Sequence, residues 1–318
     1  MHIPLALVTG FLGSGKTTFL EAVAARHRDR RLVFLVNEIS PRDVDGVRLR
    51  AAADRVLTVA GGSIFCRCVV TEFIHHLKDL PERHGAPGSP VEGVVVEASG
   101  MADPTAAAPL LRETGLDARY RLASVTALVD PGSIAKVIRT LPAARAQLEA
   151  ASVVLLNKTD LAAPDAVEAA ERLVREIAPG ARVLRTVRAS AKVDLFGDSS
   201  PPPDCAGQLA DCVDPRIGRL LLRFRGPADL GDLRRRLESL GDDVYRAKGF
   251  VPAPDGRRVA IDLSPAGLTF GEALPGPAEP EVAVVVRGLA RHHAARILGG
   301  TANAALIDEP PEDPGDNA

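Results

Sequence analysis

The stretch Gly10-Phe11-Leu12-Gly13-Ser14-Gly15-Lys16-Thr17-Thr18 (GFLGSGKTT) decides the fold of this chain. Up to Thr17 it matches the phosphate-loop pattern G-x-x-x-x-G-K-[ST] at every fixed position. Glycines let such a loop turn tightly, so that several backbone N–H groups point at one anion. We expect Lys16 to neutralise the β- and γ-phosphates of a nucleotide as a catalytic residue, and Thr17 to bind Mg²⁺ through its hydroxyl. The expected phosphate-binding set is Gly10, Gly13, Ser14, Gly15, Lys16, Thr17 and Thr18.

The sequence around this loop alternates buried strands with helices. The apolar run Ile3–Thr9 precedes the loop, and a helical pattern over 17–26 follows it. Further helices are predicted over 69–80, ending at Pro81, and over 164–177. Further strands are predicted over 32–37, 55–59, 93–98, 122–129, 152–156 and 183–187. Such alternation around a phosphate loop predicts an α/β fold, a P-loop domain with a mostly parallel sheet covered on both faces.

The alternation stops at residue 197, which divides the chain. We expect the P-loop domain to span 1–196. Residues 197–215 are rich in Pro, Asp and Ser and are predicted to form a linker or a long surface loop. A second pattern of short strands and two helices over 216–308 predicts a small C-terminal α+β domain. The acidic, Pro-rich residues 309–318 are expected to be a disordered tail.

The composition excludes several classes of protein. Among 318 residues, 39 are Lys or Arg and 41 are Asp or Glu, so the formal net charge is −2. This balance gives no global attraction to nucleic acid or to an anionic membrane. No run of about 18 uncharged apolar residues is present, and no basic segment with a cleavage site starts the chain. We therefore expect a cytoplasmic protein without nucleic-acid or membrane partners.

The tetrapeptide Asn157-Lys158-Thr159-Asp160 follows the predicted strand 152–156, at the ligand-binding edge of a parallel sheet. A carboxylate such as Asp160 can accept hydrogen bonds from the N1–H and the 2-amino group of guanine, a donor pair that adenine lacks. Asn157, Lys158 and Asp160 are therefore the expected guanine-binding residues. A solvated loop is the alternative. Residues 190–192 (SAK) could also lie against the base.

Acidic residues end two other predicted strands. Glu97 follows the strand that starts at Gly93, and it is expected to bind Mg²⁺, directly or through water, or to orient the attacking water. Gly100 would let a backbone N–H approach the γ-phosphate. Glu38 ends the second strand and is a candidate catalytic residue; either Glu38 or Asp45 could join the magnesium shell. A helix or turn cap is the alternative for Glu97, and a solvated loop residue is the alternative for Glu38 and Asp45.

Together these motifs resemble those of the CobW-like GTPases, the cobalamin-synthesis and metallochaperone branch of the P-loop GTPases. The resemblance covers nearly the whole chain and includes EASGMADP, where most GTPases carry Asp-x-x-Gly and this family carries Glu-x-x-Gly. The matching segments are GFLGSGKTT at 10–18, VNE at 36–38, VDG at 44–46, GG at 61–62, EASGMADP at 97–104, NKTD at 157–160 and YRAKGFV at 245–251.

The resemblance implies Mg²⁺-dependent GTP hydrolysis that is coupled to delivery of a transition metal, usually Zn²⁺ or Co²⁺. The partner that it implies is a client metalloprotein or a cofactor-dependent enzyme, and a homodimer is an open alternative. Loops around 38–46 and 61–68 would become ordered on the γ-phosphate and Mg²⁺. No arginine finger is evident in the sequence, so we expect slow turnover without a partner.

The sequence departs from the family at its metal motif. The family has GG-Cys-x-Cys-Cys, whereas this chain has Gly61-Gly62-Ser63-Ile64-Phe65-Cys66-Arg67-Cys68. Ser63 and Phe65 replace two thiolates, only Cys66 is in register, and Cys68 is an addition. The usual three-sulfur site therefore cannot form, although Cys66 and Cys68 are candidate ligands if other residues complete four-fold coordination.

The candidates for completing that shell are Glu72, His75 and His76, which follow on a predicted helix, with Glu72 and His76 on one face. Several alternatives remain open. These three residues could form a solvated helix face, Cys66 and Cys68 could be small buried hydrophobic residues, and Arg67 could lower the pKa of both thiols and make them reactive. Cys205 and Cys212 lie in the predicted linker, and His292-His293 is expected to be a surface pair.

Three functions are consistent with these observations. The first is a GTP-driven metallochaperone that uses Cys66 and Cys68. The second is a GTP-regulated switch that has lost metal handling and acts by binding a client. The third is a small-molecule kinase on a P-loop scaffold, against which NKTD argues because it selects a guanine nucleotide.

Overall fold

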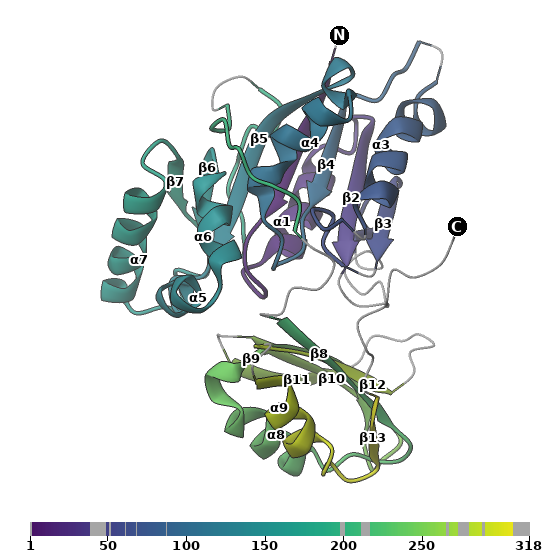
Figure 1. The fold of residues 1–318 in the computed structure, drawn as a ribbon, viewed down its shortest axis with the longest axis vertical. Coiled ribbons are helices and arrows are strands. Elements are labelled where there is room, and N and C mark those ends of the chain that lie inside the picture. The colour runs from purple at the N-terminus through teal and green to yellow at the C-terminus, as the bar shows by residue number, and fades with distance from the viewer. Residues whose placement is uncertain are drawn as a thin grey trace. The chain divides into compact units, whose positions relative to one another are not determined.

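The structure is a computed structural model (Figure 1) that describes residues 2–38, 49–50, 52–60, 62–67, 69–86, 88–197, 201–210, 217–264, 267–272, 280–287 and 290–307. The chain divides into two compact units, Met1–Cys212 and Val213–Ala318. No helix in the described ranges has both the length and the apolar character needed to cross a membrane.

The first unit is built on a parallel sheet. Within the described residues it has seven strands in the order β3-β2-β4-β1-β5-β6-β7. Every pairing is parallel, so all the carboxyl ends meet at one edge. The strands are β1 Ile3–Thr9, β2 Leu32–Glu38, β3 Val56–Ala60, β4 Gly93–Glu97, β5 Tyr120–Val129, β6 Val153–Leu156 and β7 Arg182–Arg185.

Helices cover both faces of this sheet (Figure 1). Helix α1 packs on one face together with the segment from Ala189 to Leu195. On the opposite face, α3 and α4 pack on the β1, β2 and β4 side, and α6 and α7 pack on β5 and β6. The helices are α1 Lys16–Arg26, α3 Val70–His84, α4 Ala107–Glu113, α5 Ile134–Thr140, α6 Pro142–Glu149 and α7 Pro164–Ile177, with short 3₁₀ turns η1 Pro104–Ala106 and η2 Leu116–Ala118.

The second unit is an antiparallel sheet with helices on one face. Its described strands follow the order β11-β10-β9-β12-β8-β13. Helices α8 and α9 pack on the face that carries Leu222, Ala247 and Val284. The elements are β8 Ile217–Phe224, α8 Leu230–Ser239, η3 Gly241–Asp243, β9 Val244–Pro252, β10 Arg258–Ser264, β11 Gly267–Glu272, β12 Glu281–Arg287, α9 Arg291–Leu298 and β13 Ala304–Ile307. The predicted fold class, a parallel α/β domain plus a small α+β domain, is confirmed.

The prediction that the helix after residue 69 ends at Pro81 is wrong, because α3 continues to His84 with Pro81 inside it. Proline has no N–H, so the carbonyl of Leu77 loses its helical donor. The Tyr120 hydroxyl, from the start of β5, donates to that carbonyl over 2.6 Å. Tyr120 is 1% exposed, and burial raises the pKa of its hydroxyl, which therefore stays a donor. A tertiary contact thus replaces the missing backbone bond.

Because the Tyr120 hydroxyl replaces the missing N–H of Pro81, we expect substitutions at these two residues to have coupled effects on the free energy of unfolding. Tyr120→Phe should lower the free energy of unfolding of the first unit by about 1–3 kcal/mol, because it leaves the buried Leu77 carbonyl without a donor. In a Pro81→Ala background the new N–H can donate to Leu77, so the same substitution should cost clearly less. Urea denaturation of the four full-length variants measures this cycle. Equal costs in both backgrounds would show that Tyr120 does not compensate for Pro81.

Candidate nucleotide-binding site

The phosphate loop joins β1 to α1, and its glycines have left-handed backbone conformations. The φ angle is 135° at Gly10, 79° at Gly13 and 107° at Gly15. A Cβ at Gly10 would lie 2.3 Å from the carbonyl oxygen of Leu128, so a larger residue there would displace backbone. Helix α1 begins at Lys16 with no side-chain cap, which leaves its first N–H groups to bind an anion. Lys16 is buried and donates to the Gly10 carbonyl over 2.8 Å.

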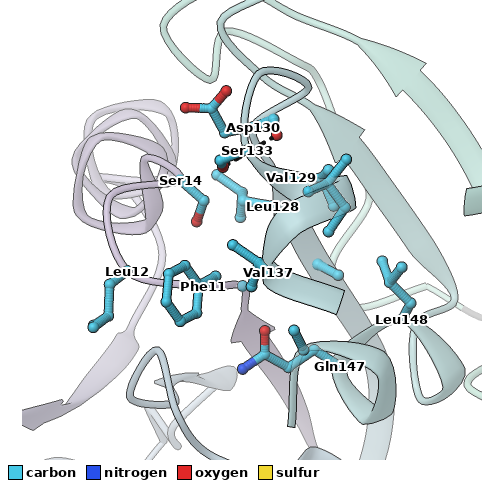
Figure 2. Close-up of a pocket in the computed structure, with 14 residues that line it drawn as sticks. Phe11, Leu12, Ser14, Leu128, Val129, Asp130, Ser133, Val137, Gln147 and Leu148 are labelled. Atoms are coloured by element: carbon cyan, nitrogen blue, oxygen red, sulfur yellow. Dashed lines mark hydrogen bonds between the residues drawn. The ribbon is translucent and has the colours of Figure 1, made fainter. Parts of the chain in front are cut away.

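One flank of the loop is closed by the first unit itself. Figure 2 shows Phe11 and Leu12 facing a wall that includes Leu128, Val137 and Gln147. The free space between them is about 10 Å³, roughly the room for one water molecule. This flank of the loop is therefore filled by side chains of the first unit.

Asn157 connects the phosphate loop to the predicted base-binding segment. It is buried, and its Nδ2 donates to the Ser14 carbonyl over 2.8 Å. Its Oδ1 accepts from the backbone N–H of Ala189, also at 2.8 Å. A Cβ at Gly15 would lie 2.4 Å from Asn157 Nδ2, so the two residues are already in contact. The Asn157 side chain thus connects three segments. They are the phosphate loop, the end of β6 and the residue that directly precedes residues 190–192 (SAK).

Lys158 and Asp160 complete this end of the site. Lys158 has a left-handed backbone, with φ of 61°, and its ammonium lies 3.0 Å from Asp130 Oδ2. Asp130 follows β5, the strand next to β6, and also accepts from the Gly132 N–H over 2.9 Å. Asp160 is exposed, with its carboxylate accessible to a ligand. The sequence analysis missed Asp130, although the rule that selected Glu97, an acid that directly follows a buried strand, would have found it.

Glu97 ends β4 between β1 and β2, paired in register with Val8 and Val36. It is 4% exposed, and buried carboxylates are normally paired or bound to a cation. Two hydroxyl groups, those of Ser14 in the phosphate loop and of Ser99 just after Glu97, are buried and have no hydrogen-bond partner within the described residues. Thr17, in the first turn of α1, is half-buried. A carboxylate and hydroxyl oxygens are hard ligands that suit Mg²⁺, so these residues fit that ion.

Gly100 lies against the phosphate loop, as the sequence predicts for a γ-phosphate contact. A Cβ at Gly100 would be 2.7 Å from the backbone nitrogen of Leu12. The buried Gln147 of α6 holds this turn by donating to the carbonyls of Gly100 and Ala102, each over 3.1 Å. No sequence motif marks Gln147, since its role depends on where α6 packs.

The side chains of two predicted acidic ligands lie outside the part of the chain that the structure describes. Glu38 ends β2, but its side chain lies outside the described residues, as does all of Asp45. Cys68 and Cys212 also lie outside them.

The loop that carries Cys66 is apolar. Ile64 is 0% exposed, Phe65 1% and Cys66 5%, and the rings of Phe65 and Phe73 pack edge to face. Phe65 therefore belongs to the core at a position where the family motif has a ligand. This burial agrees with the alternative in which Cys66 is a small core residue.

The other candidate ligands are dispersed. Glu72 and His76 lie one turn apart on α3 with Oε1 and Nε2 3.6 Å apart, while His75 is exposed. Burial raises the pKa of the Cys205 thiol, and the negative charges of Asp103, Asp204 and Glu149 add to that effect. Cys205 is thus poorly suited to ligation, which needs a thiolate. His292 and His293 are exposed on α9, as expected of a surface pair. In the ranges that the structure describes, no group of three or more His, Cys, Asp or Glu residues could hold a metal.

Comparison with known proteins identifies the family of the chain. The family model described as "CobW/HypB/UreG, nucleotide-binding domain" matches residues 4–185. The chain is 32% identical over 270 residues to the zinc chaperone YjiA of Escherichia coli, covering 78% of this chain and 81% of that protein. It is 24% identical over 264 residues to zinc-regulated GTPase metalloprotein activator 1 of Saccharomyces cerevisiae, covering 70% and 59%.

Among solved structures, Zn(II)-bound YjiA GTPase from E. coli matches 94% of this chain and 99% of that chain at 20% identity, with a TM-score of 0.42. The family model, which spans more than half of the chain, and the identity to YjiA confirm the resemblance that the motifs indicated. The chain belongs to the CobW/HypB/UreG family and carries its nucleotide-binding domain.

Proposed function

We propose that this protein is a Mg²⁺-dependent GTPase that couples hydrolysis of GTP to metal delivery or to activation of a client. The observation that carries the proposal is the position of Asn157, which ties NKTD to the phosphate loop through the Ser14 carbonyl. This contact holds the segment that carries Asp160, the proposed guanine acceptor, at the same sheet edge as the phosphate loop. The names of two relatives, a zinc chaperone and a zinc-regulated GTPase activator, support the coupling to metal.

In this proposal each residue has a distinct task. Backbone N–H groups between Gly10 and Thr18 bind the β-phosphate, and Lys16 exchanges its contact with the Gly10 carbonyl for the β- and γ-phosphate oxygens. Asp160 accepts from guanine. Gly100 brings a backbone N–H to the γ-phosphate, and Glu97 with Glu38 orients the attacking water. Thr17 and Glu97 would hold Mg²⁺, which when bound neutralises charge that develops on the phosphates.

The metal cargo is proposed to bind at Cys66 and Cys68. A second candidate function, a GTP-regulated switch without metal handling, is favoured by one specific observation. Phe65 packs in the core on Phe73, so one position of the three-sulfur motif is filled by a buried ring. The two functions differ in whether Cys66 and Cys68 bind a transition metal. In either case the client is a metalloprotein or a cofactor-dependent enzyme, and a homodimer remains a proposal.

Removal of the loop lysine should abolish catalysis. Lys16→Ala is expected to lower kcat for GTP by at least about 100-fold, because a buried charge that stabilises the transferred phosphoryl group is lost. Phosphate release measured with GTP and Mg²⁺ tests this prediction, and omission of Mg²⁺ should have a similar effect. Lys78→Ala, at an exposed position on α3, is the matched control and should leave the rate unchanged. Equal hydrolysis by both variants would exclude the phosphate-loop mechanism.

Base selection should depend on the charge of a single residue. Asp160→Asn should weaken GTP binding by about 10- to 100-fold, because the carboxylate that accepts from two guanine donors is replaced by an amide. The same amide can donate to the 2-oxo group of xanthine, so binding of xanthosine triphosphate should improve. Competition of each triphosphate against labelled GDP measures both changes. Hydrolysis of ATP at the rate of GTP by the wild-type chain would contradict guanine selection.

Metal binding should depend on both cysteines of the loop. Zn²⁺ and Co²⁺ affinity, measured against a competing chelator, should fall at least about 10-fold in Cys66→Ser/Cys68→Ser, since loss of residues that only hydrogen-bond to metal ligands already costs that much. It should also change when a non-hydrolysable GTP analogue is bound. Cys205→Ser is the control and should have no effect. Wild-type affinity equal to that of the double variant would favour the switch without metal handling.

A further inference from the structure

Asn37, at the end of β2, uses its side-chain amide for four hydrogen bonds. Its Nδ2 donates to the carbonyls of Val59 over 3.3 Å and Gly62 over 2.6 Å. Its Oδ1 accepts from the backbone N–H of Ile64 over 3.0 Å and from that of Ser99 over 3.2 Å. The side chain is 5% exposed. An amide has two donor hydrogens and an acceptor oxygen with two lone pairs, so Asn37 is fully used by these partners.

One of these partners belongs to the nucleotide side. Ser99 lies between Glu97 and Gly100, and Gly100 is in contact with the phosphate loop at Leu12. The Ser99 carbonyl accepts from the Ala102 N–H, which places both residues in one tight turn. A shift of this turn on contact with a γ-phosphate would therefore move the Ser99 N–H that Asn37 holds.

Two of the other three partners belong to the loop that carries Cys66, defined here as residues 62–67, and the third, Val59, lies in β3. Gly62 and Ile64 are bound by Asn37, and Phe65 and Arg67 bond to the linker segment through Ala210. The Ala210 N–H donates to the Phe65 carbonyl over 2.8 Å, and the Arg67 N–H donates to the Ala210 carbonyl over 3.0 Å. The linker segment 201–210 thus lies against the first unit as a parallel partner of this loop.

A second contact joins the same linker segment to the chain beyond the Ser99 turn. The Gly207 N–H donates to the Thr105 carbonyl over 3.3 Å, and a Cβ at Gly207 would lie 2.0 Å from Thr105 Oγ1. Asp204 forms an ion pair with Arg112 of α4 at 3.2 Å. The segment that leads to the second unit is therefore fixed to the Cys66 loop, to Thr105 and to α4.

We propose that Asn37 is a positioning residue that transmits the state of the γ-phosphate from the Ser99 turn to the Cys66 loop and to the linker segment bonded to it. Because the amide is saturated and buried, its Ser99 bond cannot change without disturbing the bonds to Gly62 and Ile64. The coupling is reciprocal, so a ligand on the Cys66 loop also alters the preference for GTP over GDP. The inference rests on the proposed function, since it needs two nucleotide states.

Because the chain contains no tryptophan, the fluorescence of a single introduced indole can be measured without emission from other indoles. Gln208→Trp places a single indole at an exposed position in the linker segment. Its emission and acrylamide quenching are compared with GDP and with a non-hydrolysable GTP analogue, in the Asn37 and the Asn37→Asp backgrounds. Asp has the shape of Asn but cannot donate to Val59 or Gly62. Asn303→Asp, which removes an equivalent donor in the second unit, is the matched control.

With Asn37 present, the two nucleotides should give different indole signals, and Asn37→Asp should reduce that difference at least threefold. The affinity for labelled GDP and the KM for GTP should change less than threefold, because the phosphate loop and NKTD are untouched, whereas kcat should fall about tenfold. Ala210→Pro, which removes the donor to Phe65, is a second variant that should abolish the signal difference without lowering kcat.

Retention of the full signal difference in both Asn37→Asp and Ala210→Pro would overturn the inference. So would a Gln208→Trp chain with Asn37 intact that binds both nucleotides with identical indole signals. A wild-type chain that binds no guanine nucleotide at all would overturn the proposed function as well, and labelled-nucleotide binding distinguishes this case from the others.

Discussion

The nucleotide site depends on the contact between Asn157 and the phosphate loop. Two buried hydrogen bonds from one amide hold the Ser14 carbonyl and the Ala189 N–H in place. The phosphate loop follows β1 and Asn157 follows β6, with β5 between these strands. The amide bridges that gap, and the absence of a side chain at Gly15 makes the approach possible. Loss of this contact would separate the phosphate end of the site from the base end.

In a parallel sheet the carboxyl ends of all strands lie at one edge, so residues from several strands can contribute to one site there. Glu97 ends a buried strand, and Asp130 and Asn157 each directly follow one, so all three lie at the edge where the nucleotide would bind. Asn37, the penultimate residue of β2, lies at the same edge of the sheet. Its partners are backbone groups of neighbouring segments rather than a ligand. Polar side chains at this edge therefore divide between binding and positioning.

The loop that carries Cys66 shows how a family site can be altered while the fold is kept. Ser63 leaves a small polar group and Phe65 adds a ring to the core, so the loop is held by apolar packing and by Asn37. A loop that is held in this way can still follow the nucleotide state. Whether it carries a metal depends on Cys66 and Cys68, whose chemistry the proposed chelator competition measures.

The fold class, most strands and the phosphate loop were predictable without the structure, because these follow from local patterns of apolar residues and glycines. Helices α4, α5 and α6 and strand β13 had no clear periodicity and were not predicted. Only the tertiary structure decided that α3 continues through Pro81, since the donor that Leu77 needs comes from Tyr120, 43 residues away. The same holds for Gln147 on Gly100, Asp130 on Lys158 and Asn37 on Ser99: these side chains act through partners that are distant in sequence, and no local pattern encodes such pairs.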